Sequence, residues 1–264
     1  METRELASGA AMPVLGLGVW QMEEGSETEQ AVEWALEAGY RHVDTAAMYR
    51  NERSVGNAIR RSGVPREDVF VTTKLMPTRL DVERALAQSL DRLRLDYVDL
   101  YLIHWPLRGV YPRQWRALEK LRERGLARDV GVSNFGTGEL DSLARRGMQV
   151  PAVNQVQFSP FRYRRGLLDY CEERGIVFEA YSPLEQGRVD HPAIVALAER
   201  LGRTPAQVML RWAIQHGTVV IPKSSRRDRI RSNAEVFDFE LDDEAMTELD
   251  SLDRTGGTAR ARGG

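Results

Sequence analysis

The stretch VFVTTKLMPTRLDVERALAQSLDRLRLDYVDLYLIH, residues 69–104, reads as a strand, a helix and a second strand. The β-branched run Val69 to Lys74 precedes the amphipathic run Asp81 to Leu93, and the apolar run Val98 to His104 follows. Short apolar runs that alternate with longer amphipathic runs are typical of βα units in a parallel sheet. The segment therefore predicts one repeat of an α/β fold.

The same alternation extends through the chain in both directions. The predicted strands are Leu15 to Val19, His42 to Thr45, Val69 to Lys74, Val98 to His104, Asp129 to Ser133, Ala152 to Val156, Val177 to Tyr181 and Val219 to Ile221. The predicted helices are Glu27 to Ala38, Glu52 to Arg61, Asp81 to Leu93, Pro112 to Arg124, Gly138 to Arg146, Arg164 to Arg174, Ala193 to Leu201 and Pro205 to Gln215. Eight such units in 264 residues predict a (β/α)8 TIM barrel.

The two ends of the chain differ from this repeat. The opening segment Leu6 to Met12, with Ser8-Gly9 at its middle, predicts a β-hairpin across the barrel floor. The tail Thr255 to Gly264 is small and polar, and we expect it to be loosely held. No linker-like tract interrupts the series, so we expect residues 1–264 to form a single domain.

Composition excludes several classes of function. The net charge is −2 and the arginines are interspersed with acids, so we expect no nucleic-acid partner. No run approaches the roughly 18 apolar residues of a membrane span, and the first residues do not resemble a secretory signal. We therefore expect a cytoplasmic monomer without a membrane partner. Spacings such as HExxH or CxxC do not occur, which predicts no metal site. Cys171, the single cysteine, is expected to be a packed thiol.

Polar side chains gather where the predicted strands end. In (β/α)8 barrels the chemistry is built at the carboxyl ends of the strands. The side chains at these positions are Asp44, Tyr49, Lys74, His104, Ser133, Asn134, Gln155, Tyr181 and Lys223. Chance would scatter such groups over both ends of the barrel, so the clustering predicts a site.

Eight segments carry a family resemblance. They are GLGVWQ from Gly16, HVDTAAMYRNE from His42, VTTKL from Val71, YLIHWP from Tyr101, GVSNF from Gly131, NQVQFSP from Asn154, AYSPL from Ala180 and IPKSS from Ile221. In this order they resemble the motifs of the aldo-keto reductase family, and in particular small bacterial members such as 2,5-diketo-gluconate reductases. The resemblance covers nearly the whole chain. It implies a catalytic tetrad, which falls on Asp44, Tyr49, Lys74 and His104.

The chemistry of carbonyl reduction agrees with this tetrad. Hydride addition leaves negative charge on the carbonyl oxygen, so the site needs a proton donor and a stabilising charge. Tyr49 is the expected donor, and the ammonium of Lys74 would lower the cost of its phenolate. Asp44 would compensate that ammonium, and His104 would orient the substrate oxygen. Only three of the 37 basic residues are lysines, and two of these, Lys74 and Lys223, lie at proposed functional positions.

The cofactor that the resemblance implies is NADP(H). A glycine-rich dinucleotide fingerprint is missing after Gly16-Leu17-Gly18, so the cofactor must bind at the barrel rim. The resemblance assigns the nicotinamide to Ser133, Asn134, Gln155 and Tyr181. The phosphates and adenine fall to Ser182, Leu184, Lys223, Ser224, Arg229 and Asn233. Lys223, Ser224 and Arg229 suit a 2′-phosphate, which favours NADPH over NADH. The expected substrate pocket is bounded by Trp20, Met48, Tyr49, His104 and Trp105.

Alternative interpretations stay open at this point. Asp44 would serve as a helix cap, and Tyr49 and His104 as packing or structural groups, if there were no such site. Arg226, Arg227, Arg229 and Arg231 would then coat a solvated helix, and His42, His191 and His216 are expected to be structural in either case. Two other functions compete with a reductase of small aldehydes, ketones or dicarbonyls. They are a cofactor-binding regulatory subunit, like the potassium-channel β subunits of this family, and a barrel enzyme with different chemistry.

Overall fold

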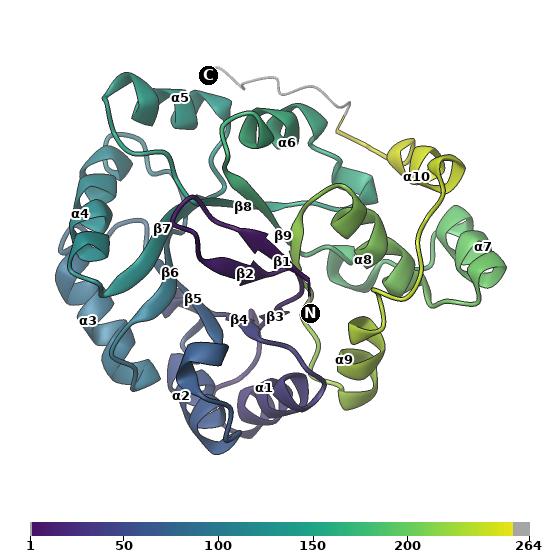
Figure 1. Cartoon of the computed structure of the whole chain (residues 1–264), viewed down its shortest axis with the longest axis horizontal. Coiled ribbons are helices and arrows are strands. Elements are labelled where there is room, and N and C mark those ends of the chain that lie inside the picture. Colours follow the sequence, from purple (N-terminus) through teal and green to yellow (C-terminus); the bar gives the residue numbers. More distant parts are fainter. Residues whose placement is uncertain (1, 256–264) are drawn as a thin grey trace.

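The computed structural model describes residues 2–255, so residues 256–264 of the predicted loose tail lie outside the described part of the chain. Eight parallel strands form a barrel, hydrogen-bonded in the sequential order β3 to β10. Figure 1 shows them as a ring surrounded by helices. The strands are β3 (Leu17–Gly18), β4 (His42–Asp44), β5 (Phe70–Leu75), β6 (Val98–Ile103), β7 (Ala127–Ser133), β8 (Val153–Gln157), β9 (Val177–Tyr181) and β10 (Val219–Ile221). The predicted (β/α)8 barrel is confirmed.

Eight helices match the predicted runs to within a few residues at each end. They are α1 (Ser26–Glu37), α2 (Glu52–Arg61), α3 (Val82–Leu93), α4 (Tyr111–Glu123), α5 (Thr137–Arg145), α6 (Arg165–Glu172), α7 (Pro192–Leu201) and α8 (Pro205–Gln215). Two further helices, α9 (Arg227–Ala234) and α10 (Asp243–Asp250), were not among the predicted elements. In α9 only Ile230 and Asn233 are buried, so the segment carries little of the periodic apolar pattern on which the prediction depended.

The barrel closes between its first and last strands. Leu15 forms a parallel bridge with Val220, and the Gly16 N–H donates to the Val220 carbonyl at 2.9 Å. A Cβ on Gly18 would lie 2.9 Å from the carbonyl oxygen of Ile221, so this close approach of two backbones requires glycine. β3 is shorter than the predicted strand, because the residues before it contribute only this bridge.

A β-hairpin covers one end of the barrel, as predicted. Its strands β1 (Thr3–Glu5) and β2 (Ala11–Pro13) pair antiparallel, and Figure 1 shows them crossing the centre of the ring. The predicted segment forms mainly the turn, and the strands flank it. Leu6 and Met12 are buried in a cluster with Phe70, Leu100 and other strand residues. This floor leaves the opposite end of the barrel for the site.

Helices α8 and α9 are fixed to each other beside that open end. Thr204 caps α8, because its hydroxyl accepts from the Gln207 N–H at 3.2 Å and the Gln207 side chain accepts from the Thr204 N–H at 2.9 Å. The Gln207 amide also donates to the Ser232 carbonyl of α9 at 2.9 Å. Asn233, the next residue, is thereby held at the rim.

Candidate active site

The four residues of the expected tetrad form a contiguous group at the carboxyl ends of β4, β5 and β6. The Lys74 ammonium donates to the Asp44 carboxylate at 2.6 Å and to the Tyr49 hydroxyl at 3.3 Å. It also donates to the Thr45 carbonyl at 2.9 Å, which accounts for its three N–H groups. The rings of Tyr49 and His104 meet edge to face with centroids 5.6 Å apart. The order of the strands in the barrel therefore brings together residues as far apart in the chain as Asp44 and His104.

Lys74 is fully buried, with 0% of its surface exposed, and Asp44 is nearly so. Burial alone would lower the pKa of the Lys74 ammonium, but the charge of Asp44 and the contact with Tyr49 outweigh it and raise that pKa. Burial raises the pKa of the Asp44 carboxyl, and Lys74 and Gln155 partly oppose this effect. Complete burial makes each partner of this ion pair depend strongly on the other for its charge.

Tyr49 and His104 are both held in their neutral forms. Burial raises the pKa of the Tyr49 hydroxyl, and the charge of Lys74 opposes that rise without cancelling it. Lys74 alone would lower the pKa of Tyr49, but burial of the phenol is the larger effect and the pKa rises. Burial and the Lys74 charge lower the pKa of His104 to about 3. Tyr49 thus carries a transferable proton, and a neutral imidazole can donate one N–H.

Gln155 joins the tetrad to a second buried group. Its amide donates to Asp44 at 2.7 Å and to Glu179 of β9 at 2.9 Å. Its carbonyl oxygen has no partner among residues 2–255, and this leaves an acceptor at the site. Glu179 also lies 3.6 Å from the His42 ring, and burial raises the pKa of its carboxyl to about 8. His42 is the buried structural histidine that was expected.

Glu179 was missed by the sequence argument, although a signal for it exists. It is an acid inside the short apolar strand VFEAY, and an acid is rarely buried without a partner. The strand register supplies that partner, because Gln155 and Glu179 lie opposite each other in the pairing of β8 with β9.

Ser133, Asn134 and Tyr181 form a hydrogen-bonded chain across the ends of β7 and β9. The Tyr181 hydroxyl donates to the Asn134 side-chain oxygen at 2.9 Å, and the Asn134 amide donates to the Ser133 hydroxyl at 3.0 Å and to the His104 carbonyl at 3.1 Å. Asn134 adopts a left-handed backbone with φ of 64°, as does Ser182 with φ of 49°. These uncommon turns directly after two strands set the direction of the polar side chains.

The residues expected to hold the phosphates and adenine line one cavity. A cavity of about 540 Å³ is lined by Ser182, Leu184, Lys223, Ser224, Arg229 and Asn233, and also by Trp20. Lys223 and Arg229 have no ion-pair partner within residues 2–255. In contrast, Arg227 pairs with Glu37 at 3.0 Å and both side chains are exposed. The cavity therefore presents two uncompensated cations.

The expected substrate pocket has an open wall. Trp20, Met48 and Trp105 expose 42%, 44% and 48% of their surfaces, which is unusual for side chains of this size. Each lies next to a strand end or beside a tetrad residue in the chain. Exposed apolar groups around a buried polar centre are typical of a ligand site, but their contacts with a substrate stay a prediction.

Other expectations concern the rest of the molecule. Cys171 is buried, as expected, and burial raises the pKa of its thiol to about 11. Within residues 2–255 the structure contains no group of three or more His, Cys, Asp or Glu side chains that could hold a metal ion. None of the helices in that range has the length and apolar character required to cross a membrane.

Comparison with known proteins agrees with this geometry. The model of the aldo/keto reductase family matches residues 14–254. Glyoxal reductase of Bacillus subtilis is 47% identical over 96% of this chain and 93% of its own length. An aldo-keto reductase of Mycolicibacterium vanbaalenii is 52% identical, covering 92% of this chain and 88% of its own.

Solved structures give the same result. An aldo/keto reductase from Brucella melitensis superposes with a TM-score of 0.92 at 41% identity, covering 95% of this chain and 97% of that one. The aldose reductase from Schistosoma japonicum gives a TM-score of 0.90 at 35% identity, with coverage of 96% and 93%. Members of this family generally use nicotinamide cofactors. The chain belongs to the aldo/keto reductase family and is an oxidoreductase that acts on carbonyl groups.

Proposed function

We propose that this protein reduces the carbonyl group of small aldehydes, ketones or dicarbonyls with NADPH, and that Tyr49 is the proton donor. The observation that carries the proposal is the buried Lys74 ammonium, which contacts both the Asp44 carboxylate at 2.6 Å and the Tyr49 hydroxyl at 3.3 Å. A buried ammonium held against a phenol stabilises the phenolate that forms when the phenol gives up its proton.

The cost that this arrangement must offset follows from the acidity of the phenol. An ordinary tyrosine has a pKa near 10, so its phenolate lies about 4 kcal/mol uphill at pH 7. Burial of Tyr49 raises the pKa further, so stabilisation has to come from Lys74 as the proton leaves. The attraction between Lys74 and Tyr49 becomes stronger as the phenolate forms. It therefore lowers the activation barrier of carbonyl reduction without tightening the binding of the substrate in the ground state.

The dinucleotide, when bound, supplies the hydride. The residues present fit a nicotinamide carboxamide, because the Ser133 hydroxyl can donate to its oxygen and the free Gln155 oxygen can accept from its amide. The Tyr181 hydroxyl is hydrogen-bonded to Asn134, the residue after Ser133, and the Tyr181 ring is suited to stacking against the nicotinamide. Tyr49 would deliver its proton to the carbonyl oxygen, and the neutral His104 would hold that oxygen through one N–H.

Preference for NADPH rests on the rim cavity. Lys223 and Arg229 line it without a carboxylate partner, and a 2′-phosphate is the group of NADPH that would compensate them. The cavity also contains the Ser224 hydroxyl and the buried Asn233, which suit a phosphate oxygen and the adenine edge respectively.

Substrate class is proposed from the pocket and from a relative. The wall of Trp20, Met48 and Trp105 is exposed and apolar, so it can accept small substrates of varied shape. The Bacillus subtilis relative is named as a glyoxal reductase, and glyoxal is a small dicarbonyl.

A panel of aldehydes and dicarbonyls tests the proposal, with consumption of NADPH followed by absorbance. We expect turnover with small dicarbonyls and simple aldehydes, and slower turnover when NADH replaces NADPH. Tight NADPH binding without turnover on any member of the panel would favour the regulatory-subunit alternative and contradict the proposal.

A further inference from the structure

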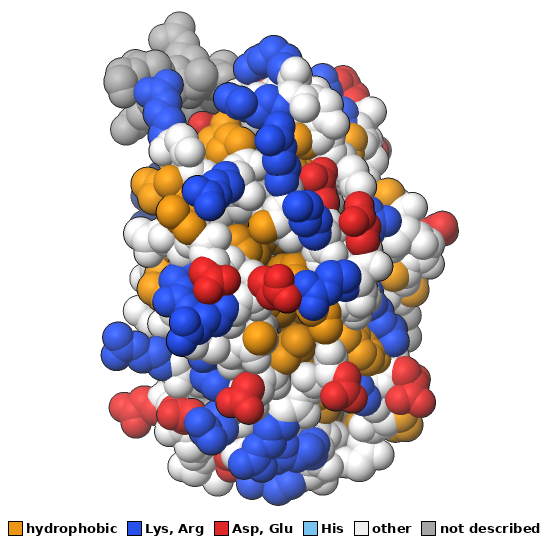
Figure 2. Space-filling model, turned by 90° about the vertical axis from the view of Figure 1, so that its left-hand side faces the viewer, with side chains coloured by type: hydrophobic (Ala, Val, Ile, Leu, Met, Phe, Trp, Pro, Cys, Tyr) orange, Lys and Arg blue, Asp and Glu red, His pale blue; other side chains and the backbone are white. Residues whose placement is uncertain are grey.

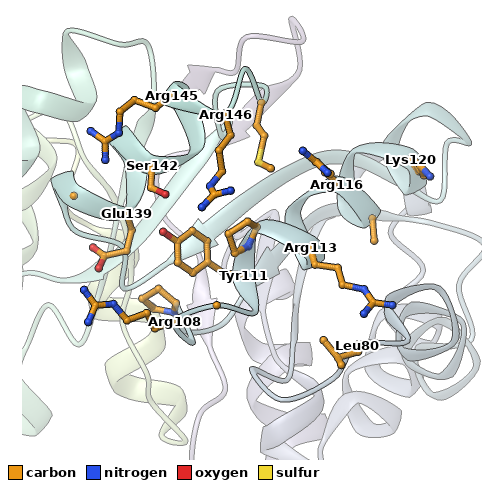
Figure 3. A pocket seen from close by; sticks show the side chains of 16 residues that line it. Leu80, Arg108, Tyr111, Arg113, Arg116, Lys120, Glu139, Ser142, Arg145 and Arg146 are labelled. Carbon is orange, nitrogen blue, oxygen red and sulfur yellow. The ribbon is translucent and has the colours of Figure 1, made fainter.

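A deep groove lies on the outer face of the barrel, away from the tetrad. It is enclosed by α4, α5 and the loop that precedes α4, and its volume is about 1160 Å³. Figure 2 shows this side of the molecule, where blue basic side chains surround patches of apolar surface. Figure 3 shows the groove from close by. None of the tetrad or proposed cofactor residues lines it.

The groove is strongly basic. Its lining includes one carboxylate, Glu139, and six cations, namely Arg108, Arg113, Arg116, Lys120, Arg145 and Arg146. None of these cations makes an ion pair or a side-chain hydrogen bond within the described part of the chain. Glu139 is already engaged, since it accepts from the Gly136 N–H at 3.0 Å. A chain with a net charge of −2 therefore concentrates uncompensated positive charge at one concave surface.

A tyrosine hydroxyl points into the groove. Tyr111 exposes only 7% of its surface, and its ring packs edge to face on Phe135 with centroids 5.1 Å apart. Its hydroxyl has no hydrogen-bond partner within residues 2–255. Figure 3 shows this hydroxyl directed toward Ser142, whose own hydroxyl is also unpartnered, with the Arg146 side chain beside them. Because this hydroxyl reaches the groove and has no protein partner in that range, it is free to donate to an acceptor bound there.

The chemistry of the lining identifies the class of ligand. Two hydroxyls and a guanidinium that converge are donors suited to the oxygens of a phosphate group. Six cations around one groove call for more than one such group. Lys120, one of only three lysines in the chain, also lines this groove. Pockets for small molecules commonly have volumes of about 300–1000 Å³, so the groove is large enough for an intact small ligand.

Nucleic acid fits the lining less well. Sequence-tolerant binding of single strands uses exposed aromatic faces on which bases stack. Among residues 2–255, Tyr111 is the sole aromatic side chain that lines the groove, and its ring is buried against Phe135. We propose that the groove between α4 and α5 binds a small-molecule anion that carries two or more phosphate groups. This site is separate from the proposed cofactor cavity, and the proposal does not depend on the reaction.

Calorimetric titration with inorganic tripolyphosphate tests this inference at a fixed low ionic strength. Tyr111→Phe removes only the hydroxyl, and Arg146→Ala removes one cation beside it. Each change should weaken tripolyphosphate roughly tenfold, as expected for loss of a hydrogen bond to a charged group. The matched control is Arg200→Ala, because Arg200 is an exposed arginine of α7 without an ion-pair partner in the described residues. It should change the affinity less than twofold.

Several results would overturn the proposal. They are an absence of tripolyphosphate binding, equal weakening by Arg200→Ala and the groove variants, and unchanged binding in Tyr111→Phe. Citrate, a carboxylate anion of lower charge, should bind more weakly than tripolyphosphate, and equal binding would reject the phosphate assignment. Binding of a single-stranded oligonucleotide that depends on Arg146, without binding of tripolyphosphate, would indicate a nucleic-acid surface instead. Circular dichroism melting verifies that each variant is folded. If Arg146→Ala does not fold, Tyr111→Phe still tests the proposal, because it keeps the ring and its packing.

Discussion

Replacing Lys74 by methionine should affect stability and catalysis through different interactions. The substitution removes the ammonium that contacts Asp44 at 2.6 Å, the Thr45 carbonyl at 2.9 Å and Tyr49 at 3.3 Å. It keeps most of the side-chain volume, so little packing is lost. Asp44 would remain buried without its counter-charge, and breaking a buried ion pair in this way costs about 3–5 kcal/mol of unfolding free energy.

The double variant Lys74→Met/Asp44→Asn separates the two effects. It removes both charges, so most of the unfolding free energy lost in the single variant should return. Reductase activity should stay low in both variants, because neither supplies an ammonium to Tyr49. Urea unfolding followed by tryptophan fluorescence measures the first quantity, and kcat/KM for a small aldehyde measures the second.

Two outcomes would refute this reasoning. Recovery of kcat/KM together with stability in the double variant would show that the ammonium serves only to balance Asp44. Wild-type stability in the single variant would show that Asp44 does not depend on Lys74 for its charge. As a control, the unfolding transitions measured by fluorescence and by circular dichroism should coincide. This shows that each variant unfolds in two states, so that the unfolding free energies can be compared.

Three further predictions concern the cofactor rim, the buried network and the barrel floor. Arg229→Ala should weaken NADPH at least tenfold, about 1.4 kcal/mol, and NADH much less, whereas equal weakening in a fluorescence titration would remove Arg229 from the 2′-phosphate. Burial raises the pKa of Glu179 from 4.5 to about 8, so the folded state holds this proton more tightly than the unfolded state does. The resulting contribution to the unfolding free energy is fully present below pH 4.5 and is lost as the pH rises through about 8. Glu179→Gln should therefore lose less stability than the wild type over that interval, and parallel pH profiles of urea unfolding would contradict this. Leu6→Ala should cost about 2–5 kcal/mol of unfolding free energy while kcat stays near wild type, and a loss of kcat without a loss of stability would argue against a purely structural floor.

Elements with a regular apolar pattern were predictable, and those without one were not. The strand and helix runs between Val69 and His104 appear in the structure almost unchanged, because both depend on local periodicity. Helix α9 has few buried side chains, so its sequence lacks that pattern. Helix α10 did carry a signal, since Asp242 accepts from the Ala245 N–H at 2.8 Å as an N-cap and acids fill its first turn. Its start was recognisable from the capping residue alone.

The proximity of Asp44, Tyr49, Lys74 and His104 was predictable, because each lies at or just after the carboxyl end of a strand and parallel strands end at the same side of a barrel. Their catalytic roles come from the family resemblance and stay a prediction. Glu179 was not predictable, because its importance depends on the register that sets it opposite Gln155. The direction of the Tyr49 pKa also required the structure, since the extent of burial is set by residues distant in the chain.

The basic groove shows a different limit of sequence reasoning. Its cations are separated along residues 108–146 by acids such as Glu119 and Asp141, so the chain contains no basic block. Packing of α4 beside the α5 region brings Arg116 and Arg146 to one groove. Charge clustering of this kind is a property of the folded surface and cannot be recognised from local sequence composition.

Stopped-flow measurement of hydride transfer in Tyr49→Phe tests the proposed mechanism most directly. The change removes one hydroxyl and keeps the ring that packs beside His104, so the fold and NADPH affinity should be preserved. A single turnover reports the chemical step without the contribution of product release. We expect the rate of carbonyl reduction to fall by about 10²–10⁴, the usual contribution of a positioned general acid. A chemical step as fast as in the wild type would contradict the assignment of Tyr49 and make His104 the leading candidate for the proton donor.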